Sequence, residues 1–246
     1  MKHLYFLFLL IAAPAFAQEF IETDRPGQSS TTSTVPANHF QMETGLRHTQ
    51  AEPRQPQWQL PASLLKYGVN DKFELRLNAQ YAYNKTPDST NSGFKPLVGG
   101  VKAKLSEEKG WLPAAALLIN FTIPNAASES FKTDYLAPEV VFLMKNSVGN
   151  SAEIQYNIGV SWDGQSPGPS YLYSFSPNFD LTDKLGMFIE SYAYFPEHAH
   201  PDHWVDGGLA FLITNAIQLD VSAGYELSSH DNHHSFFESV GFSFRI

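Results

Sequence analysis

The chain has 246 residues, a formal net charge of −9 and no cysteine; 17% of its residues are charged and 14% are aromatic. The negative charge argues against a nucleic acid as a partner. Without cysteine, no disulfide can stabilise the fold. The charged fraction is below the roughly 25% that is usual for soluble domains.

The first 17 residues, MKHLYFLFLLIAAPAFA, have the organisation of a secretory signal peptide. Lys2 and His3 precede a short apolar run, and Ala15-Phe16-Ala17 forms a small-x-small cleavage motif. The run is shorter than the roughly 20 residues that a membrane-spanning helix needs. We therefore expect residues 1–17 to be removed on export and the mature protein to start at Gln18.

Residues 18–38 are polar, rich in serine and threonine, and show no periodicity. One interpretation is a flexible leader on the periplasmic side of a membrane. The alternative is a plug: the segment would fold back into the domain formed by residues 39–246, where Asp24 and Arg25 would pair with charges on its wall.

From His39 onward the sequence consists of period-2 segments and has no convincing 3.6-residue periodicity. Most of the predicted strands have 11 residues or more, whereas strands of globular proteins usually have about five or six. A tilted strand needs about 9–11 residues to cross a bilayer. We predict twelve strands, at approximately 39–49, 57–69, 73–85, 93–105, 111–123, 135–145, 151–162, 170–181, 184–195, 203–213, 216–228 and 235–246.

The connections between these strands alternate between tight turns and longer loops rich in Pro, Ser, Asn and His. This rhythm, with an even number of strands, is typical of outer-membrane barrels. We therefore predict an all-β, twelve-stranded antiparallel transmembrane β-barrel over residues 39–246, in the outer membrane of a Gram-negative bacterium. The short turns and both termini would be periplasmic. The tight turns are 69–72, 106–110, 145–150, 182–184 and 214–216.

The two faces of each strand differ in polarity, as in the stretch FELRLNAQYAY at 73–83. A soluble sheet would bury the apolar face, whereas a membrane barrel turns it toward lipid. We predict that the apolar face contacts outer-membrane lipid and that the polar face lines a lumen. The charged residues expected to line the lumen are Glu43, Arg47, Glu74, Arg76, Lys102, Lys104, Glu139, Glu153, Asp180, Glu190, Asp206, Asp220, Glu226 and Arg245.

These charges have two interpretations. Twelve strands lie between the filled eight-stranded barrels and the open channels of about 16–18 strands. The set contains nine acids and five bases, which predicts a narrow permeation path with a cation bias. Alternatively, buried ion pairs plug the barrel, since unpaired charges in a dry lumen would be costly.

The chain ends on SVGFSFRI, in which Phe242, Phe244 and Ile246 share one face. Such an apolar C-terminal strand predicts the barrel-assembly machinery as a partner. Two features conflict with a regular barrel. Glu238 falls on the lipid face, where it is tolerable only near the outer interface. Prolines within predicted strands, which remove ladder donors and predict bulges or shifted boundaries, are Pro61, Pro96, Pro113, Pro138 and Pro177.

The N-terminal motifs Thr23-Asp24-Arg25-Pro26, Val35-Pro36, His39-Phe40-Gln41 and Glu43-Thr44-Gly45 resemble the start of a family of outer-membrane transporters associated with the phenol meta-degradation pathway. This chain has Asn38 where that family often has glycine. The resemblance covers about 25 residues by motif and implies an outer-membrane β-barrel with a channel role. It also suggests aromatic or other hydrophobic compounds as the small-molecule permeant, whose identity the residues do not reveal.

Histidines cluster in the last two long loops: His198, His200, His203, His230, His233 and His234. Imidazole with the neighbouring carboxylates would suit Zn²⁺, Cu²⁺ or Ni²⁺, although the spacing matches no established metal signature. A solvated polar surface is the alternative. A plugged or metal-capturing surface barrel is thus the second functional hypothesis.

An outer-membrane lipid-modifying enzyme is a third and weaker hypothesis. The sequence has no G-x-S-x-G, H-E-x-x-H or glycine-rich phosphate loop, so we predict neither catalysis nor a cofactor. Ser170 and Ser235 lie near the level that a lipid hydrolase would use. His234 adjoins Ser235, but adjacent strand residues point to opposite faces.

Overall fold

The computed structural model describes residues 20–51, 55–228 and 234–246, so the predicted signal peptide lies outside the described residues. Within these ranges no helix is long and apolar enough to cross a membrane. The elements are β1 (Phe40–Gln50), β2 (Pro56–Asn70), β3 (Phe73–Lys85), β4 (Thr90–Phe94), β5 (Val98–Ser106), β6 (Ala114–Thr122), the 3-10 helix η1 (Glu129–Phe131), β7 (Ala137–Ser147), β8 (Ala152–Ser161), β9 (Ser170–Asp180), β10 (Leu185–Pro196), β11 (Asp202–Thr214), β12 (Ile217–Glu226) and β13 (Phe236–Arg245).

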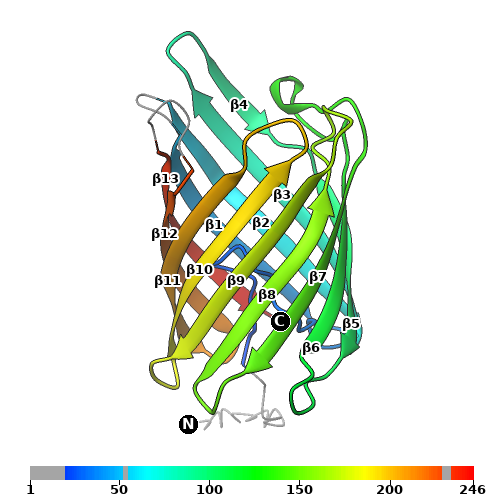
Figure 1. Ribbon diagram of the computed structural model, residues 1–246, viewed down its shortest axis with the longest axis vertical. Helices are drawn as coiled ribbons and strands as arrows, with labels where there is room; N and C mark the ends of the chain where they lie inside the picture. Colours follow the sequence, from blue (N-terminus) through cyan, green and yellow to red (C-terminus); the bar gives the residue numbers. More distant parts are fainter. Residues whose placement is uncertain (1–19, 52–54, 229–233) are drawn as a thin grey trace, which may run out of the picture.

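The strands form one antiparallel sheet that closes on itself (Figure 1). The pairing of β1 with β13 joins the ends of the chain, and the β2–β3 pairing completes the ring. Because β4 and β5 pair with successive parts of β3, they occupy one position, and the wall is a closed twelve-stranded barrel. Closure pairs both sides of every strand except β4, which pairs with β3 alone, and such a closed ladder is the condition for β-structure in a bilayer. The predicted fold class is confirmed.

The strand boundaries differ from the predictions mainly at prolines. The single strand expected at 93–105 is split around Pro96 into β4 and β5, and β6 begins only after Pro113. Pro61 lies where the β1–β2 and β2–β3 registers shift. Pro177 lies in a gap of the β9–β10 ladder, and Pro138 is the second residue of β7. Each position except the last therefore shows the bulge, gap or shifted boundary expected where a ladder donor is absent.

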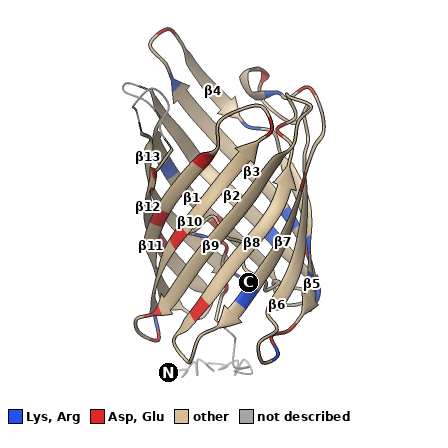
Figure 2. Cartoon of the chain, in the orientation of Figure 1, with Lys and Arg blue, Asp and Glu red and all other residues tan. Residues whose placement is uncertain are grey.

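The apolar face of the wall points outward. Leu75 is 49% exposed and Ile158 is 55% exposed, whereas their neighbours in the alternation, Glu74 and Asn157, are 1% and 3% exposed. Most of each strand is tan in Figure 2, so charged residues are sparse along the wall. Glu238 lies toward the loop end of β13, and its Oε1 lies 3.2 Å from His48 Nδ1. This distribution is that of a barrel solvated by lipid.

Residues 20–38 run inside the barrel as an irregular segment (blue in Figure 1). We call these residues the N-terminal segment. It leaves the lumen at Asn38, whose backbone N–H donates to Gly68 O at 2.7 Å and whose φ is 62°. The left-handed region favours glycine first and asparagine among the other residues. This conformation explains how asparagine can stand where glycine is common in the resembling family.

Candidate functional site

The strands β2, β3 and β5 place three bases on the inner face of the wall. The tight turn between β2 and β3 sets a register in which Lys66 pairs with Arg76. In the next ladder, Glu74 pairs with Lys102. All three bases are almost fully buried, since their side chains are 1%, 7% and 0% exposed. Isolated charges at such depth would be strongly unfavourable.

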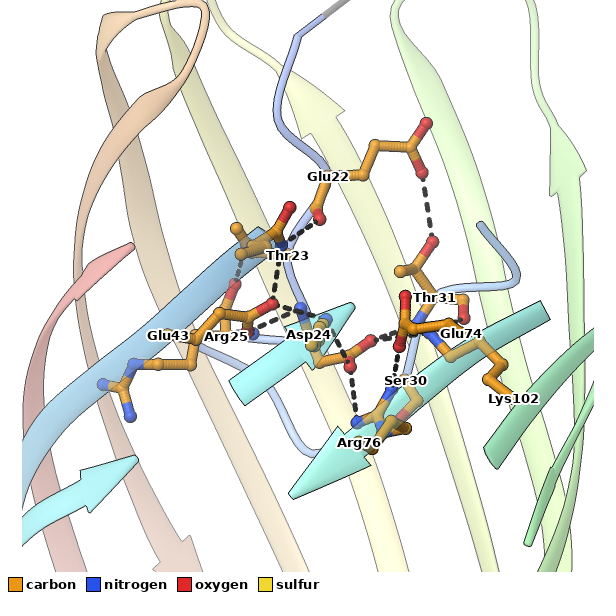
Figure 3. A network of polar contacts seen from close by, with 12 residues as sticks. Glu22, Thr23, Asp24, Arg25, Ser30, Thr31, Glu43, Glu74, Arg76 and Lys102 are labelled. Atoms are coloured by element: carbon orange, nitrogen blue, oxygen red, sulfur yellow. Dashed lines mark hydrogen bonds and ion pairs between the residues drawn. The ribbon is translucent and has the colours of Figure 1, made fainter. Parts of the chain in front are cut away.

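Asp24 of the N-terminal segment is the common partner of these bases; Figure 3 labels it together with Arg76 and Lys102. Its Oδ2 lies 2.7 Å from Lys66 Nζ and 2.8 Å from Arg76 Nη2, and its Oδ1 lies 3.4 Å from Lys102 Nζ. The backbone N–H of Thr31 also donates to Asp24 Oδ1 at 2.9 Å. Three cationic groups and one backbone N–H thus converge on one carboxylate.

Two wall acids complete this group. Glu43 is ion-paired with Lys66 at 2.5 Å, and Glu74 with Arg76 at 3.1 Å. We call Asp24, Glu43, Glu74, Lys66, Arg76 and Lys102 the charge cluster. Its three acids balance its three bases only when the N-terminal segment supplies Asp24.

The three bases of the charge cluster control the ionisation of Asp24. Burial alone would raise the pKa of this carboxyl, but Lys102, Lys66 and Arg76 together hold the pKa well below its ordinary range. Asp24 is therefore ionised at neutral pH and carries the negative charge that the three bases require.

Arg25 anchors the segment on the wall strands β12 and β13. Its Nη2 donates to Asp220 Oδ1 at 3.0 Å and to Ser239 Oγ at 2.9 Å. The guanidinium lies against Gly45 and Gly241, which are paired directly across β1 and β13. A Cβ at either position would overlap the Arg25 guanidinium, so the wall is shaped for this side chain.

Glu190 of β10 binds the next turn of the segment. Its carboxylate accepts hydrogen bonds from the backbone N–H groups of Gln28 at 2.6 Å and Ser29 at 2.7 Å, and from Ser29 Oγ. The hydroxyls of Ser29 and Ser174 lie 2.7 Å apart. Lys145 of β7 also contacts Glu22, and Asn157 of β8 donates to Ser30 O. The segment is therefore bonded to strands in many parts of the wall.

Two cavities remain beside the N-terminal segment at the short-turn end of the barrel. One, of about 590 Å³, extends toward β3–β7 and is lined by residues that include Gln41, Glu74 and Lys104. The other, of about 900 Å³, extends toward β7–β12 and is lined by residues that include Arg25 and Asp180. The segment therefore narrows this end of the lumen without filling it.

The family model described as "Putative MetA-pathway of phenol degradation" matches residues 23–246. The chain belongs to this family. The family resemblance seen in the sequence is thus confirmed. The lumen of this barrel is therefore interpreted below as that of a member of the phenol-degradation family.

Solved structures similar to this member of the phenol-degradation family are outer-membrane barrels. An outer membrane channel from Pseudomonas putida F1 has a TM-score of 0.67 at 11% identity, over 92% of this chain and 100% of that chain. The NanC porin has a TM-score of 0.59 at 8% identity, over 83% and 100%. The translocator domain of the autotransporter NalP from Neisseria meningitidis has 0.54 at 11%, over 85% and 89%. At these identities the similarity shows the fold alone. No curated protein matches the chain.

In this family member, the structure buries most of the charged residues that the sequence assigned to the lumen. Arg47 lies over the Phe237 ring at 3.6 Å, Glu139 accepts a hydrogen bond from Asn120, and Glu153 is ion-paired with Lys145. Lys104 pairs with Glu107 near the turns, and Asp180 lines the larger cavity. The buried members are Glu43, Glu74, Arg76, Lys102, Glu190, Asp206, Asp220, Glu226 and Arg245.

Sequence reasoning did not identify Lys66 and Lys145, which contact the segment residues Asp24 and Glu22. In β2 the consecutive Leu64 and Leu65 hide the alternation, and in β7 the apolar run that precedes Lys145 does the same. The hairpin register was a usable signal, because the tight turn at 71–72 places Lys66 opposite Arg76.

The histidines of the long loops have separate surroundings where they are described. His203 packs edge-on against Phe195, and His234 stacks on Tyr225. His198 lies 3.9 Å from Glu197. No group of three or more potential metal ligands occurs among the described residues, and His230 and His233 lie outside them. Metal binding by the six histidines therefore stays a prediction.

The Ser–His pair of the enzyme hypothesis has other partners in the structure. Ser235 Oγ donates to Ala51 O at 2.8 Å, while His234 Nδ1 lies 2.9 Å from Glu226 O. Neither contact orients the imidazole to activate the serine hydroxyl, which is the geometry that nucleophilic catalysis requires.

Proposed function

We propose that this protein is a channel for small molecules in the outer membrane of a Gram-negative bacterium, to which it is exported by residues 1–17. In this proposal the N-terminal segment determines how much of the lumen is open. The closed wall with an apolar outer face and a polar inner face supports the membrane setting.

The observation that carries the channel proposal is the pair of cavities beside the segment. Cavities of about 590 and 900 Å³ lie where the segment would otherwise seal the short-turn end. Because most bonds between the segment and the wall involve side chains and none belongs to a β-ladder, the segment can shift while the wall remains closed.

The family description supports an aromatic or otherwise hydrophobic permeant. Aromatic side chains in the inner alternation of β10, β11 and β13 fit such a compound. Tyr192 and Trp204 stack with ring centroids 6.2 Å apart, and Trp204 lies 5.9 Å from Phe237. Tyr192 and Phe237 are themselves buried, at 4% and 1% exposed, so Trp204 is the member of this group that would offer apolar contact area to a passing ring.

A plugged structural barrel is the second candidate, and one observation favours it. The N-terminal segment bonds to wall residues on β1, β2, β3, β5, β7, β8, β9, β10, β12 and β13. This number of bonds favours a segment that closes the lumen permanently.

Solute uptake by liposomes with a lockable segment distinguishes these candidates. The variant Ser29→Cys/Ser174→Cys places two thiols where hydroxyls lie 2.7 Å apart, in a chain without other cysteines. We expect uptake of a small neutral sugar by the wild type and by the reduced variant, and slower uptake when the variant is oxidised. The single variant Ser174→Cys is the matched control and should not respond to oxidation.

A chain that lacks residues 18–38 provides the decisive outcome. If the wild type, the reduced double variant and this folded deletion variant all fail to take up sugar, the channel proposal is wrong and the structural barrel is favoured. Faster uptake by the deletion variant than by the wild type would support the role assigned to the segment.

A further inference from the structure

In the charge cluster, the wall supplies all three bases but only two of the three acids. Lys66, Arg76 and Lys102 are fixed on three neighbouring strands, and the wall supplies only Glu43 and Glu74 to balance them. The third negative charge comes from Asp24, on a segment without regular structure. Without that carboxylate, this buried group of side chains has one excess positive charge.

We propose that Lys66, Arg76 and Lys102 form a binding site for the carboxylate group of a small anionic permeant, and that Asp24 occupies this site as an internal ligand. This inference rests on the proposed channel function and deepens it. The ligand class is a small monocarboxylate. Its carboxylate would replace that of Asp24 and displace the neighbouring part of the segment.

The geometry of the donors fits an exchangeable carboxylate. Both oxygens of Asp24 are contacted, one by Lys66 and Arg76 and the other by Lys102. Charge-assisted hydrogen bonds of this kind are among the strongest that proteins make. Replacing one carboxylate by another leaves the buried charge unchanged, so the exchange avoids the large cost of an unpaired buried ion.

A cavity borders the site at the short-turn end, and displacement of the segment would connect the two. The cavity of about 590 Å³ is lined by Gln41 and by Glu74, a member of the charge cluster, and also by segment residues 32–36. Lys102 Nζ donates to the backbone oxygens of Thr31 and Ser33 at 2.9 and 3.1 Å. Lys102 therefore contacts both Asp24 and the part of the segment that borders the cavity.

The charge balance predicts discrimination among ligands of equal size. A neutral alcohol cannot supply the negative charge that the three bases require, and a cation would meet an excess of positive charge once Asp24 has moved. Benzoate, benzyl alcohol and benzylammonium share one ring and differ in this charge, so they are suitable probes.

Isothermal titration of the full chain in detergent tests the site. Asp24→Asn removes the internal ligand, and we expect it to bind benzoate at least about tenfold more tightly than the wild type, whose site is available only when Asp24 has left. Neither other probe should bind. Glu22→Gln is the matched control, because it removes one segment carboxylate that contacts only Lys145 among the bases, at 3.7 Å. Its affinity should remain that of the wild type.

A second measurement keeps the test valid if Asp24→Asn fails to fold. In Ser30→Cys with Asp24 intact, benzoate should increase the rate of maleimide labelling, because displacement of Asp24 frees the adjoining residues. Benzyl alcohol and an equal concentration of chloride should not. The proposal is overturned if folded Asp24→Asn binds no benzoate, or if benzoate leaves the labelling rate unchanged.

Binding and permeation separate this proposal from the channel proposal. A protein that binds benzoate but passes no sugar in any form would contradict the channel and leave the site standing. A protein that passes sugar but binds no benzoate would contradict the site alone.

Discussion

At the scale of single residues, the lumen is shaped by which side chains are absent as well as by which are present. Gly68 faces the N-terminal segment, and a Cβ there would overlap the backbone oxygens of Val35 and Pro36. Backbone atoms cannot be moved by a rotamer change, unlike the Arg25 guanidinium beside Gly241. Gly68 is therefore the residue at which the smallest substitution acts most directly on the segment.

We expect Gly68→Ala to weaken segment docking while the barrel remains folded. Overpacking typically costs about 1–3 kcal/mol, which corresponds to roughly a 5- to 150-fold shift in an equilibrium. Sugar uptake by liposomes should rise accordingly. Gly99→Ala is the control, because nothing lies within 4 Å of a Cβ there. Unchanged uptake by folded Gly68→Ala would show that this contact does not hold the segment.

At the scale of elements, the wall and the N-terminal segment are stabilised in different ways. The wall strands are joined by continuous backbone ladders, whose strength does not depend on individual side chains. The segment depends on a few charged groups, chiefly Asp24, Arg25 and the carboxylate of Glu190. The segment is therefore the element that changes of pH or charge should move first.

The contribution of Asp24 to segment docking should be insensitive to mild acid. Because the pKa of Asp24 is lowered in the folded state, its contribution is present above the ordinary aspartate pKa of about 3.9 and is lost only as pH falls through the lowered value. The groups facing it are Lys66, Arg76 and Lys102, which stay protonated in acid, with Glu43 and Glu74 beside them.

Conductance in planar bilayers provides the measurement. We expect the ratio of the Asp24→Asn conductance to the wild-type conductance to be the same at pH 7 and at about pH 5, and to fall toward one only below about pH 3.9. A fall of this ratio already at about pH 5 would show that the contact is controlled by a different group. Asp24→Asn should have the raised conductance at every pH, since it lacks the titrating carboxyl.

At the scale of the whole molecule, closure of the sheet separates two solvents. Leu75, Val221 and Phe242 face lipid while Glu74, Asp220 and Ser243 face the interior. Val221 lies in the middle of β12, and Leu181 lies in the turn after β9; both are 49% exposed. In a soluble protein a charged substitution would have a similar cost at these two exposed positions. In a membrane barrel the cost differs, because one position lies deeper in the bilayer than the other.

We therefore expect Val221→Arg to destabilise the folded barrel in lipid by about 2–4 kcal/mol and Leu181→Arg by about 0–1 kcal/mol, because the cost of an arginine depends on its depth. Urea titration of folding into lipid vesicles measures both. Equal effects of the two substitutions would contradict a lipid-facing β12.

The family, the fold and the orientation of the faces could be predicted from the sequence because they depend on local patterns. Alternation in stretches such as 73–83 sets the two faces of a strand, and the lengths of turns and loops set the order of neighbours. Prolines changed only the boundaries, as at Pro96. The charged residues of regular strands could be assigned to a face by counting, whereas Lys66 and Lys145 could not, because flanking apolar residues interrupt the alternation.

The path of the N-terminal segment and the composition of the charge cluster were decided by the tertiary structure alone. The segment has no period from which a direction could be inferred, and its partners are distant in sequence: Arg25 and Asp220 are 195 residues apart. The sequence determined that there would be a polar interior with acids and bases in it. Only the closed barrel brought Lys66, Arg76 and Lys102 around Asp24, because such contacts depend on the ring being complete and on a chain end lying within it.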